Sequence, residues 1–146
     1  MQNPNPLNQL TSVAHALSDP NRVRLLAACL DQERCVCQLV ELIDLSNASI
    51  SKHLAVLKNA GLLQSRKEGR WVHYRLPDSP APILTQSLDM VRAHALSDQL
   101  ITTDTHRLTQ IDAIDPTDLA RMQRQGCCVP TQTPGAPSPS QHTPSP

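Results

Sequence analysis

Two cysteines separated by one residue, Cys35 and Cys37, are the side chains of this chain best suited to chemistry. A thiolate is a soft ligand, and two thiolates so close in sequence can bind one soft ion, such as trivalent arsenic or antimony. The chain also has Cys29, shortly before them, and the adjacent pair Cys127 and Cys128 near its end. In a reducing compartment, such a set indicates metal or redox chemistry before structural disulfides.

If Cys35 and Cys37 belong to one helix, their spacing predicts that the two thiols point in nearly opposite directions. The apolar residues that follow them predict a short helix over 35–43. Residues i and i+2 of an ideal α-helix point about 200° apart. The two thiols could then bind one atom only if the start of this helix unwound. Ligand binding is therefore expected to strain the element that supports the next helix.

That next helix has the pattern of a DNA-recognition helix. Ser46 or Asn47 is expected to cap it, because short polar side chains satisfy the free N–H groups of a first turn. Ile50, Leu54 and Leu57 then repeat at the spacing of one helical face and should be buried. The opposite face carries small polar and cationic side chains.

The other elements follow from the same kinds of pattern. Gly61 is expected to end the recognition helix. After Gly61 the spacing of apolar residues changes from that of a helix to that of strands. Two strand-like runs flank a turn at 68–70, which predicts a β-hairpin. Helices are expected over 7–17, 20–30 and 83–101, with a weaker one over 116–125. The fold predicted is mainly α with a β-hairpin wing, a winged helix-turn-helix.

In such a fold the second helix of the pair fits the major groove of DNA, which is about 12 Å wide. The start of that helix would offer backbone N–H groups to a phosphate, and the hairpin tip would contact the flanking DNA. A Ser/Lys face alone is typical of any solvated helix, so the prediction depends on the helix pair, the glycine stop and the basic hairpin together. The DNA-contacting residues predicted are Ser46, Asn47, Ser49, Ser51, Lys52, Lys67 and Arg70.

The distribution of charge agrees with a focused phosphate contact. The 146 residues have no net charge at pH 7, which argues against a general polyanion binder. Residues 47–76, however, hold six Lys or Arg and one acidic residue, Glu68. No apolar run is long enough to span a membrane, so we expect a soluble, cytoplasmic protein with no membrane partner.

Three segments of the chain resemble the ArsR/SmtB metalloregulatory repressors. Residues 16–26 are similar to the opening signature of that family, 49–63 to its recognition helix and 66–76 to its wing. The resemblance covers about 10–101. It implies a homodimeric repressor that leaves double-stranded operator DNA when it binds a metal or metalloid.

Residues 33–39 are similar to the Cys-Val-Cys box of the arsenic-sensing branch of this family. The resemblance implies As(III) or Sb(III) as the inducer, bound by Cys35 and Cys37, and no organic cofactor. Many sensors of this branch have a third cysteine where this chain has Val40. A third sulfur would then come from Cys127 or Cys128, or from Cys29, although a cysteine after a buried helical stripe is more often a core residue. Alternatively, the site uses two sulfurs together with a water or a small thiol.

Other ligand sets and other functions are less well supported. Zinc and nickel sensors of the family use paired carboxylates and histidines on the long dimer helix, and Asp89, His94 and Asp98 do not reproduce that spacing. A repressor that senses Cd(II) or Pb(II), and a thiol redox switch, remain as alternatives. An enzyme is disfavoured because the chain has no Cys-x-x-Cys, no oxyanion-binding Cys loop and no Gly-rich phosphate cradle.

Three regions are expected along the chain. Residues 1–103 should form the winged helix-turn-helix and dimerisation domain, because a small core and a long amphipathic helix over 83–101 favour a shared dimer interface. Residues 104–128 would be an extension that ends in the Cys pair. Residues 129–146, rich in Pro, Ser and Thr, are expected to be disordered.

Overall fold

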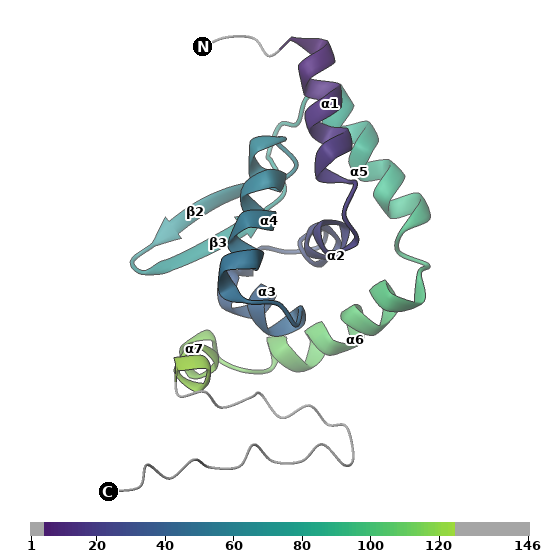
Figure 1. The fold of residues 1–146 in the computed structure, drawn as a ribbon. Helices are drawn as coiled ribbons and strands as arrows, with labels where there is room; N and C mark the ends of the chain where they lie inside the picture. Colours follow the sequence, from purple (N-terminus) through teal and green to yellow (C-terminus); the bar gives the residue numbers. More distant parts are fainter. Residues whose placement is uncertain (1–4, 125–146) are drawn as a thin grey trace, which may run out of the picture.

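The computed structural model describes residues 5–124. Most of the molecule is helical, and the two strands of the wing extend away from one side of the helical body (Figure 1). The elements in chain order are α1 (Pro6–Ala16), α2 (Pro20–Ala28), β1 (Arg34–Cys35), α3 (Val36–Leu42), α4 (Asn47–Asn59), β2 (Gln64–Glu68), β3 (Trp71–Arg75), α5 (Pro82–His94), α6 (Gln99–Asp112) and α7 (Pro116–Arg124).

Helices α3 and α4 with the β2–β3 hairpin form the predicted winged helix-turn-helix. The side-chain oxygen of Ser46 accepts a hydrogen bond from the Ser49 N–H and caps α4. Ile50, Leu54 and Leu57 are at most 1% exposed, so the predicted buried face of α4 is confirmed. The helix ends before Gly61, whose φ of 82° suits a residue without a Cβ.

The wing is part of a three-stranded antiparallel sheet in the order β1-β3-β2. Strands β2 and β3 are joined through Gly69, whose φ of 60° permits the tight turn. Strand β1, which the sequence did not predict, pairs Cys35 with His73 on the other side of β3. Cys35, the first residue of the cysteine pair, is therefore joined to the wing by backbone hydrogen bonds.

The single helix predicted over 83–101 is wrong, because the chain turns between α5 and α6. Asp98 starts a new helix, and its carboxylate accepts a hydrogen bond from the Leu100 N–H. A carboxylate at this position satisfies an N–H group that would otherwise lack a partner. The apolar stripe does not continue across the break, since Leu100 is 46% exposed while Ile101 is buried.

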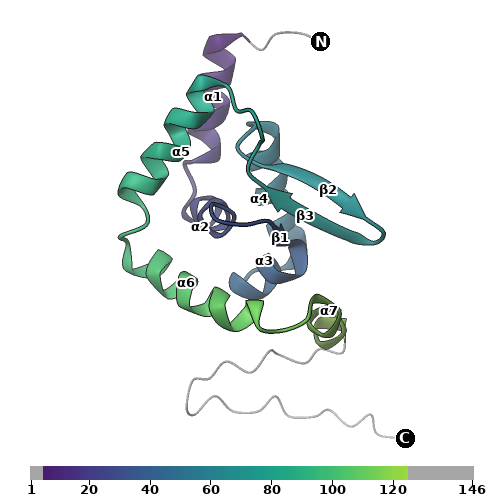
Figure 2. The same cartoon turned by 180° about the vertical axis from the view of Figure 1, so that it is seen from behind.

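Helices α6 and α7 pack across α2 and α3 on the side away from α1 (Figures 1 and 2). Asp104 of α6 accepts two hydrogen bonds from Arg24 of α2, at 2.7 and 2.9 Å. Asp112, at the end of α6, forms an ion pair with buried Arg34 next to Cys35. The division predicted between residues 103 and 104 falls inside α6.

Within residues 5–124, no helix has the length and apolar character needed to cross a membrane. The weaker helix predicted over 116–125 is present as α7. The predicted disordered segment, 129–146, and the cysteines at 127 and 128 lie outside the described residues.

Candidate functional site

Cys35 and Cys37 lie side by side at the start of α3. Cys35 is the N-cap residue and has an extended backbone, with φ −70° and ψ 147°, whereas Cys37 lies in the first helical turn. Their Sγ atoms are 2.9 Å apart as a result. The expectation that the helix must unwind before both thiols face one atom is wrong, because only one of the two residues is helical. Both thiols therefore face each other with the helix intact.

The two thiols share a buried site but differ in acidity. Cys35 is 3% exposed and Cys37 is 8% exposed. The hydrogen bond from the Cys37 thiol lowers the pKa of Cys35, assisted by the backbone N–H groups of Cys37 and Gln38 and by His73. The same contact, together with burial, raises the pKa of Cys37. The first proton therefore leaves the pair more readily than it leaves an ordinary thiol, and the remaining proton is shared.

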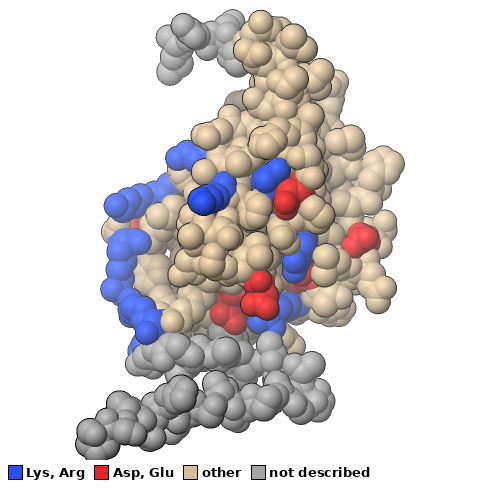
Figure 3. Space-filling model, viewed as in Figure 1, with Lys and Arg blue, Asp and Glu red and all other residues tan. Residues whose placement is uncertain are grey.

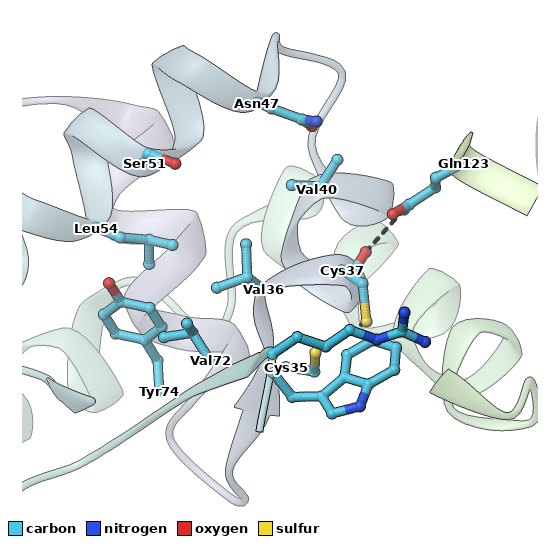
Figure 4. A pocket seen from close by; sticks show the side chains of 12 residues that line it. Cys35, Val36, Cys37, Val40, Asn47, Ser51, Leu54, Val72, Tyr74 and Gln123 are labelled. Carbon is cyan, nitrogen blue, oxygen red and sulfur yellow. Dashed lines mark hydrogen bonds between the residues drawn. The ribbon is translucent and has the colours of Figure 1, made fainter. Parts of the chain in front are cut away.

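A cavity of about 440 Å³ opens beside the two thiols (Figure 4). The start of α3 forms one wall, the flank of recognition helix α4 a second, and strand β3 of the wing with Arg70 before it a third. The lining residues are Cys35, Val36, Cys37, Val40, Asn47, Ser51, Leu54, Arg70, Trp71, Val72, Tyr74 and Gln123. We call this space the thiol cavity. It brings three of the predicted DNA-contacting residues, Asn47, Ser51 and Arg70, to the same space as both thiols.

The remaining predicted DNA contacts are distributed over α4 and the wing. Ser46 and Lys52 are exposed, and Ser49 is partly buried beside the hydroxyl of Ser46. Lys67 is exposed on β2, and the Arg70 guanidinium lies 5.2 Å from the centre of the Trp71 ring. Lys and Arg side chains gather along the edge of the molecule where the wing lies (Figure 3).

Two of the basic residues counted in the sequence form ion pairs with acidic side chains. Arg66 donates to Glu33 at 2.9 Å and to Glu68 at 2.9 Å. Arg75 forms an ion pair with Asp78 at 2.8 Å. The cationic surface available to a phosphate is therefore smaller than the charge count of residues 47–76 indicated, and it centres on α4 and the wing tip.

The other candidate ligands are held apart from the thiol pair. Cys29 ends α2 in the core, is 1% exposed and does not line the thiol cavity; burial raises its pKa to about 12. Asp89 lies 3.5 Å from Arg92, and Asp98 caps α6. Across residues 5–124, no three His, Cys, Asp or Glu side chains lie together in a way that could hold a metal ion.

The described part of the chain ends close to the thiol pair. Gln123 of α7 lines the thiol cavity, and its Nε2 donates to the carbonyl oxygen of Cys37 at 3.0 Å. The cysteines at 127 and 128 lie outside the described residues.

Two histidines have structural partners. His53 Nδ1 lies 3.3 Å from the guanidinium of Arg22, which also donates to carbonyl oxygens at the end of α1. His73 lies opposite Cys35 in the sheet and 3.7 Å from Glu33. The nearness of His73 to the thiol pair was missed, because only the pairing of β1 with β3 produces it and no local spacing indicates that pairing.

Known proteins are similar to part of this chain in sequence and in fold. Residues 19–65 match the family described as bacterial regulatory protein, arsR family. The chain is 44% identical over 70 residues to an arsenic resistance transcriptional regulator of Pseudomonas putida, which covers 47% of this chain and 55% of that protein. It is 56% identical over 50 residues to the arsenical resistance operon repressor of Escherichia coli, over 34% of this chain and 43% of that protein.

A Staphylococcus aureus relative named as a cadmium resistance regulatory protein is 43% identical over 75 residues, or 51% of this chain and 61% of that protein. The chain thus spans about half the length of the curated relatives it matches. Among solved structures, HlyU from Vibrio cholerae superimposes with a TM-score of 0.53 at 27% identity, over 64% of this chain and 99% of that one.

Fold and site together define a winged helix-turn-helix of the kind found in bacterial transcription regulators. More narrowly, residues 19–65 match the helix-turn-helix of the arsR family, and relatives named as arsenic resistance regulators are similar over part of the chain.

Proposed function

We propose that this protein is a homodimeric transcriptional repressor that releases double-stranded operator DNA when trivalent arsenic or antimony binds Cys35 and Cys37. The observation that carries the proposal is the thiol cavity. Both thiols, three residues of the recognition helix and the wing residue Arg70 line the same space. A ligand bound at the sulfurs occupies the volume on which the arrangement of the DNA-reading surface depends.

The chemistry of the pair suits a thiophilic ion. Thiolates select soft ions, and the lowered pKa of Cys35 makes the first thiolate available near neutral pH. Neither sulfur has to move far, because the Sγ atoms already lie 2.9 Å apart. The coupling to DNA then comes from the ligand in the cavity and from the β1–β3 pairing, instead of from an unwound helix.

A homodimer is supported by apolar side chains that the single chain leaves exposed. Leu7 and Leu10 of α1 are 65% and 54% exposed, and Met90 of α5 is 52% exposed. Both views of the fold show α1 and α5 side by side (Figures 1 and 2). Pairing of these helices with a second copy would bury that surface and would present two recognition helices to successive major grooves, about 34–36 Å apart. Sedimentation equilibrium should show a dimer.

The third ligand of an inorganic As(III) centre is proposed to come from Cys127 or Cys128. The support is the contact of Gln123 with Cys37 O, which brings the chain to the site shortly before those cysteines. A repressor that senses Cd(II) or Pb(II) is the second candidate, favoured by the similarity to the cadmium resistance protein. A regulator that binds DNA works where the DNA is, so we propose a cytoplasmic location.

The decisive measurement is As(III)-driven release of a fluorescent operator, followed by anisotropy. Cys35→Ser and Cys37→Ser should bind DNA like the parent but no longer respond, with a loss of roughly 1–3 kcal/mol of coupling. Cys29→Ala is the matched control, since it removes a buried cysteine outside the thiol cavity and should keep the response. A normal As(III) response in Cys37→Ser would overturn the proposal, and a response to Cd(II) alone would favour the second candidate.

The DNA-reading surface is tested separately. Lys52→Ala should weaken binding to the specific operator by roughly 1–3 kcal/mol if Lys52 contacts a base. Arg70→Ala should weaken binding to every duplex and lower the slope of log affinity against log salt by about one. Anisotropy over a range of salt concentrations measures both. Unchanged affinity in both variants would show that another surface reads DNA.

A further inference from the structure

Helix α7 is fixed next to the helix-turn-helix, although it lies well beyond residues 19–65, the part of the chain that matches the family. Its Leu119 is 0% exposed and belongs to the core. Gln123 donates to the carbonyl oxygen of Cys37 at 3.0 Å and to the carboxylate of Glu41 at 3.3 Å. These contacts hold one face of α7 against α3, so the direction of its opposite face is also fixed.

That opposite face carries two arginines. Arg121 and Arg124 are three residues apart and therefore lie on one side of the helix, away from Leu119 and Gln123. Both are exposed. Arg121 forms an ion pair with Asp118 at 2.9 Å, and the two side chains are 59% and 53% exposed. An ion pair so exposed contributes little to stability, so Arg121 can exchange this carboxylate for another anion.

The charges of α7 are ordered along its length. Asp118 lies in the first turn, whereas Arg121 and Arg124 lie in the last. Gln123, in the same last turn, lines the thiol cavity together with Arg70 of the wing. The basic end of α7 is therefore the end next to the DNA-reading elements. Both views show α7 and the wing at the same side of the molecule (Figures 1 and 2), and Lys and Arg side chains gather along this edge (Figure 3).

We propose that Arg121 and Arg124 bind backbone phosphates of the operator, beside the phosphates that the wing contacts. This inference rests on the proposed function, since it extends the same DNA-binding surface by one helix. Phosphate is the partner that fits, because two guanidinium groups on an exposed face supply positive charge and bidentate donors. Contacts with phosphate position a protein on the duplex and carry no sequence information. Helix α7 would thus contribute affinity without changing the operator sequence that is preferred.

The test uses reduced full-length protein and a fluorescent duplex that the protein itself selects from a pool of random sequence. The double variant Arg121→Ala, Arg124→Ala should bind this duplex at least about tenfold more weakly than the parent. The slope of log affinity against log salt should fall by about one for each arginine in each half-site. The ratio of the affinities for selected and random duplex should change by no more than about twofold.

Two controls separate a phosphate contact from other effects of these substitutions. Arg92 of α5 is also exposed and also lies three residues after an acidic partner, Asp89. Helix α5 is on the side of the molecule opposite the wing (Figures 1 and 2), so Arg92→Ala should leave affinity and slope unchanged within about twofold. The variant Arg121→Lys, Arg124→Lys keeps both charges and should keep the salt slope of the parent. Circular dichroism checks that every variant is folded.

Hydroxyl-radical footprinting then locates the contact. The double alanine variant should lose protection of the backbone at the flank of each half-site and keep protection around the groove that α4 enters. Unchanged affinity and slope in that variant would overturn the inference, and so would an equal loss in Arg92→Ala. A change in sedimentation with unchanged DNA affinity would assign this face to a second copy of the chain and would also overturn it. If the parent protein selects no duplex, the proposed function itself fails.

Discussion

Cys29 and Cys35 are six positions apart and almost equally buried, at 1% and 3% exposed. The pKa values of their thiols are nevertheless shifted in opposite directions. Burial among apolar side chains raises the pKa of Cys29 to about 12. A hydrogen bond from Cys37 lowers the pKa of Cys35. Burial alone therefore does not decide whether a cysteine is inert. What decides it is whether the buried sulfur has a partner that stabilises its charge.

The largest expected effect is on chemical reactivity. With iodoacetamide at pH 7, Cys35 should be alkylated at least about 100-fold faster than Cys29, because each unit of pKa changes the thiolate fraction tenfold. Peptide mass spectrometry after timed quenching measures both rates in one sample. Cys37→Ala should abolish most of the difference, since it removes the donor to Cys35. Equal rates in the parent protein would show that the two environments are alike.

Replacement by serine should lower the free energy of unfolding by different amounts at Cys29 and at Cys35. Cys29→Ser places a hydroxyl in the apolar core and should lower the free energy of unfolding by about 1–2 kcal/mol. Cys35→Ser should change it by no more than about 0.5 kcal/mol, because Cys35 is the N-cap of α3 and serine is a favoured N-cap residue. Urea denaturation followed by circular dichroism provides both values. A larger loss for Cys35→Ser would reverse the comparison.

The smallest effect is the dependence of stability on alkaline pH. The folded-state pKa of Cys29 is raised, so its contribution to stability is present below the unfolded pKa of about 9 and is lost as pH rises toward 12. Between pH 8 and 10 this loss is about 1 kcal/mol. Cys29→Ala should lose that much less stability than the parent over the same range. Parallel curves for the two proteins would mean that Cys29 ionises as freely in the folded state as in the unfolded state.

The contribution of Cys35 to stability is expected to depend on pH in the opposite direction. Its folded-state pKa is lowered, so its contribution is present above the unfolded pKa and is lost as pH falls through the folded value. Cys37→Ala removes the donor and should flatten this dependence. The two cysteines thus act on stability over different ranges of pH, and single variants separate them.

Local patterns were sufficient for much of the fold. The spacing of Ile50, Leu54 and Leu57 predicted the buried face of α4, and the turn around Gly69 predicted the wing, because both signals lie within a few residues. The break before α6 was missed although Asp98 is a good capping residue. In the sequence, apolar residues keep an approximately helical spacing across the break. The prediction followed this spacing instead of the capping signal of Asp98.

The geometry of the site could be predicted only in part. The identity of the thiol pair followed from residue type and spacing, but its arrangement did not, because Cys35 is held outside the helix by pairing with His73 far along the chain. The thiol cavity likewise depends on three elements and on Gln123 of α7. Contacts between residues so distant in sequence leave no periodic signal in either segment.

The pairing of β1 with β3 also bears on how such a protein can change over evolutionary time. Backbone N–H and C=O groups make that connection, and any residue but proline supplies both. Side chains on the outer strand of the wing can therefore be replaced without breaking the link between the sulfurs and the wing. Under the proposed function, specificity for DNA and the response to the ligand would then be open to separate selection.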